Sequence, residues 1–259
     1  MSEDDVRPLW ELTRGAARER AAGSVLVLPL GATEQHGPHL PVGTDSILVE
    51  EVARRAAASL AGEVPVVVAP TLWFGSSAHH LPFGGTLSLD TGTYYRVLMD
   101  LGRSAVSSGF GRLFFLNGHG GNHELAQLAA RDLALAQPVD AAAGSWWAMA
   151  HEELLAGGDW DTHPLPGHAG AFETSAILAQ RPELVQEPRP ARPPGQAISP
   201  GIRAGYRAEF HGAWQSIDGH TDSPAAATAD RGRAALEIAT RVVADALRAF
   251  ARASAARSG

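Results

Sequence analysis

The chain has 259 residues, a formal net charge of −7 at pH 7 and no cysteine. This length can bury a sizeable core, so we expect residues 1–259 to form one domain. The charge argues against a nucleic-acid-binding surface, and no apolar run is long enough to span a membrane. Residues 1–7 do not resemble a signal peptide, which favours a cytoplasmic location. Without thiolates, any bound metal must be held by histidines and carboxylates.

The hydrophobic pattern switches repeatedly between helical and strand periods. In chain order it predicts a helix at 9–22, a strand at Val25–Leu30, a helix at 46–60, a strand at 64–70, a helix at 92–108, a strand at 113–116, a helix at 124–136, a strand at 139–143 and an Ala-rich helix at 224–255. Alternating strands and helices predict a three-layer α/β/α fold with a mostly parallel sheet. Residues 181–200 hold six prolines, so we expect an irregular arm over the surface or into a neighbouring subunit.

The first polar cluster follows the strand predicted at Val25–Leu30. Glu34 and His36 are two residues apart, so in extended backbone their side chains face the same side. A turn rich in Pro and Gly can fold Asp45, at the start of the next helix, back toward them. Carboxylates and imidazole together are suited to Zn, Mn or Fe. The alternative interpretation is a polar loop with helix-capping residues.

Two further clusters occur at predicted loop-to-helix junctions. His119 lies in the Asn-Gly-His-Gly-Gly-Asn stretch at 117–122, directly after another apolar strand, and His168 and Glu173 lie near the start of a later helix. Alone, each could be a loop histidine or an acid favoured by a helix N-terminus. Ligands of open α/β sheets bind outside the carboxyl ends of the strands, so these clusters are predicted to converge on one site.

At these residues the chain resembles the creatininase family of metal-dependent amidohydrolases. The matching blocks are residues 28–45, 117–122 and 168–175, with weaker matches at 75–86 and 219–232, and the resemblance spans roughly residues 25–245. It implies a creatininase-like fold, hydrolysis of an amide C–N bond by a metal-activated water, and two divalent metal ions per chain. It also implies a closed homo-oligomer, with a hexamer favoured.

The resemblance assigns roles residue by residue. Glu34 and His119 correspond to ligands of one metal, His36 to a ligand of the other, and Asp45 to the bridging carboxylate. His168 corresponds to the histidine that transfers a proton to the departing nitrogen.

The loop at 75–80 and the glycine after His119 correspond to the substrate-facing part of the family site. Ser77, His80 and Gly120 are therefore expected to contact substrate, although His79 stands where relatives often have an acid. Three tryptophans could cover the site or could equally be core or interface aromatics: Trp146, Trp147 and Trp160.

One position departs from the creatinine-hydrolysing members, which carry a metal-binding glutamate two residues after the histidine of the Asn-Gly-His block. This chain has Gly121 there. Glycine offers no side-chain ligand, so we predict that Glu173 replaces it; the alternative is that only one metal binds tightly. Asp222 also stands where relatives usually have glycine.

The Gly-His-Gly-Gly-Asn version occurs in relatives that do not hydrolyse creatinine, including the mycofactocin precursor peptidase and a formamide-cleaving deformylase. The predicted substrate is therefore a small-molecule or short-peptide amide. Peptide cleavage, creatinine hydrolysis and deformylation all stay open, as does a non-catalytic binding or assembly protein of the same fold. The complete ligand set favours the enzyme, because a degenerate member should lose ligands.

Overall fold

The structure is a computed structural model that describes residues 7–157, 160, 165–192, 202–203 and 206–258. Its helices are α1 (Arg14–Ala21), α2 (Thr44–Ser59), α3 (Thr91–Ser107), α4 (His123–Ala136), α5 (Trp146–Met149), α6 (His151–Gly157), α7 (Ala171–Gln180) and α8 (Ala229–Ser258). Its strands are β1 (Val25–Leu30), β2 (Val66–Val68), β3 (Arg112–Asn117), β4 (Asp140–Ser145), β5 (Ile202–Arg203) and β6 (Tyr206–Arg207). Short 3-10 turns are η2 (Leu9–Glu11), η3 (Ala78–Phe83), η4 (Gly120–Asn122), η5 (Pro182–Leu184), η6 (Gln215–Ile217) and η7 (Pro224–Ala226).

The first four strands form one parallel sheet in the order β2-β1-β3-β4. Leu26 of β1 pairs with Val67 on one side and with Leu113 on the other. The chain runs outward from β1 to β2 and then returns to the other side of β1 as β3. The loops that follow β1 and β3 therefore leave the sheet side by side at its switch point, the place where other doubly wound folds bind their ligands.

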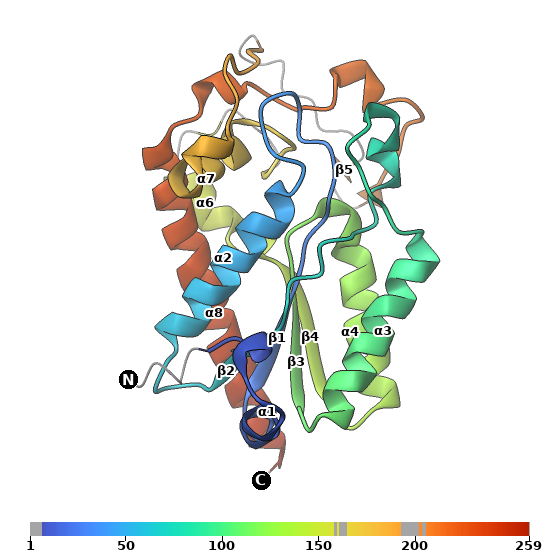
Figure 1. The fold of residues 1–259 in the computed structure, drawn as a ribbon, viewed down its shortest axis with the longest axis vertical. Helices are drawn as coiled ribbons and strands as arrows, with labels where there is room; N and C mark the ends of the chain where they lie inside the picture. Colours follow the sequence, from blue (N-terminus) through green and yellow to red (C-terminus); the bar gives the residue numbers. More distant parts are fainter. Residues whose placement is uncertain (1–6, 158–159, 161–164, 193–201, 204–205, 259) are drawn as a thin grey trace.

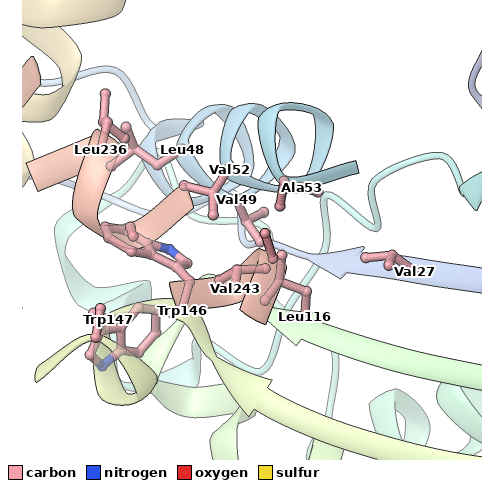
Figure 2. Close-up of a cluster of buried hydrophobic side chains, with 14 of the residues drawn as sticks. Val27, Leu48, Val49, Val52, Ala53, Leu116, Trp146, Trp147, Leu236 and Val243 are labelled. Carbon is pink, nitrogen blue, oxygen red and sulfur yellow. The ribbon is translucent and has the colours of Figure 1, made fainter. Parts of the chain in front are cut away.

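Two hydrophobic clusters cover the two faces of this sheet. Val25 and Val27 point into the cluster formed with α2, α7 and α8, whereas Leu26 and Leu28 point into the cluster formed with α3 and α4. This alternation follows from the two-residue period of a strand. Figure 1 shows helices on both sides of the sheet, and Figure 2 shows part of the first cluster, including Val27 and Trp146. The predicted three-layer α/β fold is confirmed.

The predicted elements are all present, with shifted ends. The first predicted helix is divided into η2 and α1, because Thr13 begins a new helix by accepting a hydrogen bond from the Ala16 amide. The predicted strand at 64–70 is shorter, and its central residues alone form β2. The last helix begins five residues late: Pro224 opens the separate turn η7, and α8 starts at Ala229. The β5–β6 pair was not predicted.

The proline-rich segment at 181–200 is described as far as Arg192, and its remainder lies outside the described residues. Apart from η5 it is irregular, as predicted. The described part packs on its own chain: the Gln186 amide donates to the His39 carbonyl at 2.8 Å, and the Ala225 amide donates to the Pro190 carbonyl at 3.0 Å. No helix of the described residues is both long and apolar enough to cross a membrane.

Candidate metal centre

The predicted site residues meet at the carboxyl end of the sheet, in the loops drawn at the top of Figure 1. Glu34 and His36 lie in the loop after β1, and Asp45 lies in the first turn of α2. His119 directly precedes η4 after β3, and Glu173 lies in the first turn of α7. Separate loops thus bring the side chains together from sequence positions more than a hundred residues apart.

The carboxylates and imidazoles form one continuous cluster. Asp45 lies between two histidines, with Oδ1 3.3 Å from His36 Nε2 and Oδ2 3.1 Å from His119 Nδ1. Glu34 Oε1 is 3.3 Å from the same nitrogen of His119. On the other side, Glu173 Oε2 is 3.8 Å from His36 Nε2. Asp45 is therefore placed to be shared by two groups of donors, one with Glu34 and His119 and one with His36 and Glu173.

The outer nitrogen of each of three histidines is positioned to donate to a backbone carbonyl. His119 Nε2 lies 3.1 Å from the Ser76 carbonyl, His36 Nδ1 lies 3.1 Å from the Glu34 carbonyl, and His168 Nε2 lies 2.9 Å from the Gln35 carbonyl. The opposite nitrogen of each ring faces the carboxylate cluster. Metal-binding histidines are usually held in this way, because a bond to the outer N–H fixes the ring and leaves the inner nitrogen free.

Burial and charge make this cluster suited to cations. Burial alone would lower the pKa of His36, but the combined effect of Asp45 and the neighbouring carboxylates is larger and raises it from 6.5 to about 10. Burial raises the pKa of Glu34, yet His119 and other imidazoles hold it well below its usual value. Burial raises the pKa of Glu173 to about 8. Buried carboxylates held so close together require compensating positive charge, which divalent metal ions can supply.

Buried atoms without hydrogen-bond partners also indicate a site for cations. Among the described residues, several buried polar atoms of the cluster have no hydrogen-bond partner: both carboxylate oxygens of Glu34, Nε2 of His36 and Oδ2 of Asp45. Buried polar atoms are normally paired. The donor chemistry and the orphaned atoms therefore fit metal binding. Three sets of potential ligand atoms lie within 4.8 Å of one another: Glu34 with His79 and His119, Glu34 with His36 and His168, and His36 with Asp45 and Glu173.

Gly121 is held by close packing. A Cβ at this position would lie 2.2 Å from the Ser76 carbonyl oxygen and 2.6 Å from His119 Nε2. The same carbonyl accepts from His119, so a side chain here would displace the ring's own support. In this chain the position cannot supply a ligand without rearrangement, whereas Glu173 already reaches the cluster, with its Oε2 also accepting from the Ala169 amide at 2.6 Å.

The residues predicted to contact substrate surround His119 and Glu34. Ser77 Oγ is 3.2 Å from His119 Nε2, and His80 Nε2 is 3.5 Å from Glu34 Oε1. Both side chains are fully buried, whereas Gly120 is exposed. Their role in contacting substrate stays a prediction.

The three tryptophans considered as covers of the site do not cover it. Trp146, Trp147 and Trp160 are buried in the core, where Trp146 stacks on Phe172 with ring centroids 5.6 Å apart. They are core residues, which was the alternative prediction.

Sequence reasoning missed a different tryptophan. Trp214, half-buried just before η6, lies edge-on to His80 and His168, with ring centroids 4.7 and 5.4 Å apart, and also contacts His79. It is thus an aromatic residue that borders the cluster. The only available signal was a single Trp in an irregular segment, with no periodicity to indicate where it would point.

Comparisons with known proteins agree with this geometry. The family described as "Creatininase: Creatinine amidohydrolase" matches residues 10–247. The chain is 36% identical over 239 residues to a mycofactocin precursor peptide peptidase of Mycobacterium tuberculosis, covering 88% of this chain and 84% of the relative. It is 32% identical over 257 residues to a creatinine amidohydrolase of Pseudomonas putida, covering 90% and 92%. A solved structure called "Creatininase Mn" superposes with a TM-score of 0.74 at 29% identity, covering 93% of this chain and 98% of that chain.

The fold and these matches together define a metal-dependent amidohydrolase that acts on C–N bonds. The chain belongs to the creatininase family. The predicted family, fold and enzyme class are confirmed. The roles of the individual residues, the number of metal ions and the oligomeric state stay predictions.

Proposed function

We propose that the chain hydrolyses an amide bond at a site for two divalent metal ions, held by Glu34, His36, Asp45, His119 and Glu173. The observation that carries this proposal is the position of Asp45, whose two oxygens lie 3.3 and 3.1 Å from inner nitrogens of two different histidines. Glu34 Oε1 lies 3.3 Å from His119 on one side of Asp45, and Glu173 Oε2 lies 3.8 Å from His36 on the other. A carboxylate that faces two donor groups at once is suited to bridge two cations. Zn, Mn and Fe match the donor set.

The bound metals would lower the pKa of a water molecule and polarise the amide carbonyl. The chain itself supplies proton transfer and positioning. Burial, together with the neighbouring His36, holds the pKa of His168 well below its usual value, so its ring is neutral. Its Nδ1 faces Glu34 Oε1 at 3.6 Å, inside the cluster. A neutral imidazole there can accept a proton from the attacking water and give it to the departing nitrogen.

Metal content after replacement of Glu173 tests the dinuclear site. Glu173→Gln keeps the size of the side chain but removes the charge, so elemental analysis should find close to two metals per chain in the wild type and one in the variant. Glu152→Gln, an exposed change on α6, is the matched control and should keep two. Two metals in Glu173→Gln would remove Glu173 from the ligand set.

For the substrate, we propose a peptide amide. The support is the 36% identity to the mycobacterial relative named for peptide cleavage, together with Gly121, where creatinine-hydrolysing members carry a glutamate. Packing against Ser76 and His119 excludes a side chain at that position, so the departure is built into this structure.

A substrate comparison separates the alternatives. Metal-loaded protein should cleave short synthetic peptides, detected by mass spectrometry, and should not open the creatinine ring or release formate from a formamide. Turnover of creatinine or of the formamide alone would overturn the peptide assignment and keep the amidohydrolase. Hydrolysis of none of these amides by protein that retains its metals would favour the binding or assembly alternative.

A further inference from the structure

Gln35 lies between the two proposed ligands Glu34 and His36, and its own side chain is buried beneath the site. The Oε1 atom accepts from the Gly37 amide at 2.9 Å, and Nε2 donates to the Gly219 carbonyl at 2.9 Å. The orientation of the amide is thereby fixed, because the flipped form would set Oε1 against a carbonyl and NH₂ against an N–H group. Gly219 permits this approach, since a Cβ there would lie 2.6 Å from Oε1.

The same amide nitrogen contacts two histidines that belong to different loops. Nε2 of Gln35 lies 3.0 Å from His80 Nδ1 and 2.9 Å from His168 Nε2. An amide NH₂ has two hydrogens, and Gly219 takes one of them. The second hydrogen can therefore be given to His80 or to His168 but not to both.

The backbone of Gln35 decides between them. Its carbonyl oxygen, which can only accept, lies 2.9 Å from His168 Nε2, so that nitrogen must carry a hydrogen. A protonated Nε2 cannot accept from the amide, and the remaining amide hydrogen goes to His80 Nδ1. If the amide hydrogen went to His168 instead, the lone pair of His168 Nε2 would face that of the Gln35 carbonyl oxygen at 2.9 Å. Both this carbonyl and His80 Nδ1 would then lack a donor. Buried polar atoms left in that state are strongly disfavoured, because they have lost their contacts with water and gained none in return.

We propose that Gln35 is a positioning residue that sets the tautomers of both histidines. Neutral His168 is protonated at Nε2 and bare at Nδ1, and neutral His80 is bare at Nδ1 and protonated at Nε2. The two nitrogens turned toward the cluster thus have opposite roles. His168 Nδ1 presents a lone pair 3.6 Å from Glu34 Oε1, and His80 Nε2 presents a hydrogen 3.5 Å from the same oxygen.

For catalysis, which rests on the proposed function, this tautomer makes His168 ready to accept a proton first. As water attacks, its oxygen bonds to the carbonyl carbon and its proton goes to Nδ1. When the C–N bond breaks, the nitrogen leaves with that proton, and the ring returns to its starting tautomer. If His168 carried its hydrogen on Nδ1, no lone pair would face the water.

Ring-nitrogen NMR tests the assignment in the intact protein. Zn-loaded protein labelled with ¹⁵N-histidine, studied as a solid so that assembly size does not matter, distinguishes protonated from bare ring nitrogens. His80→Asn and His168→Asn identify the two sets of signals. We expect hydrogen on Nε2 and a non-protonated Nδ1 in both rings. Hydrogen on Nδ1 of either ring in the wild type would overturn the proposal.

Replacement of Gln35 supplies the second measurement. Gln35→Met has similar length but no hydrogen-bonding amide, so His80 should no longer show a single tautomer, and kcat should fall about 10–100-fold, the usual effect of losing a supporting contact, with KM and metal content unchanged. Gln35→Glu, which puts a charged acceptor oxygen in place of the NH₂ donor, should move the His80 hydrogen to Nδ1. The matched control is Gln127→Met, because Gln127 makes a similar contact with His123 at 3.2 Å on the surface.

Unchanged His80 signals in both Gln35 variants would refute the positioning role. The NMR result does not depend on turnover. If the protein hydrolyses no amide, the proposed function fails while the tautomers still decide the inference about Gln35.

Discussion

The replacement of Gly121 by alanine is the sharpest test of how this site differs from that of the creatinine-hydrolysing members. The added Cβ would lie 2.2 Å from the Ser76 carbonyl oxygen, more than 1 Å closer than an ordinary contact. Because the clash is with backbone, the loop must move, and strain of this kind costs about 1–3 kcal/mol. For a domain of this size each kcal/mol lowers Tm by about 2–4 °C. We therefore expect a decrease in Tm of roughly 2–12 °C.

The change should also reduce metal affinity, since the displaced carbonyl is the acceptor for His119 Nε2. Losing such a support typically costs about 10–100-fold, which competition with a chelator can measure. Gly120→Ala is the control for stability and metal content, because a Cβ there meets nothing within 4 Å. Equal Tm and equal metal affinity in the Gly120→Ala and Gly121→Ala variants would refute the packing argument.

Three further predictions concern the proton-transfer residue, acid stability and assembly. His168→Ala should lower turnover by about 10²–10⁴-fold with unchanged metal content; loss of metal would make His168 a ligand. Burial lowers the pKa of His39 to about 4 from 6.5, so the unfolded chain binds the proton first as pH falls. The free energy of unfolding should therefore drop by about 3 kcal/mol as the pH falls from 6.5 to about 4. In urea unfolding measured across this pH range, His39→Asn should show a smaller drop than the wild type. An equal drop in both proteins would contradict the prediction. Light scattering should give a multiple of 27.1 kDa, with a lower mass after deletion within residues 181–200; a fully active monomer would show that the site is complete within one chain.

The sequence allowed us to predict which side chains meet at the site, because strand geometry and sheet topology determine their positions. The two-residue spacing of Glu34 and His36 places them on one side of extended chain, and both loops leave the same end of a parallel sheet. Asp45 follows from its position at the start of α2. These inferences need only the hydrophobic pattern and the positions of polar residues after each strand.

The support of the site could not be predicted in the same way. The groups that orient His119 and His168 are the carbonyls of Ser76 and Gln35, and every residue type has a carbonyl, so the sequence contains no mark of them. Trp214 lies in an irregular segment whose path depends on tertiary contacts. The roles of Trp146 and the other core tryptophans were likewise undecided, because an isolated aromatic in a sequence does not indicate which surface it will pack against.

Main-chain carbonyl oxygens orient His119 and His168, and this has an evolutionary consequence. A side-chain support can be lost by one substitution, whereas a carbonyl persists through any substitution that keeps the path of the chain. Position 76, whose own side chain is buried, can therefore change to other small residues while His119 keeps its acceptor, and saturation mutagenesis there should tolerate such residues. Selection would instead act on Gly121, whose missing side chain preserves that path. In this site a glycine that binds nothing is more tightly constrained than the residue whose oxygen makes the contact.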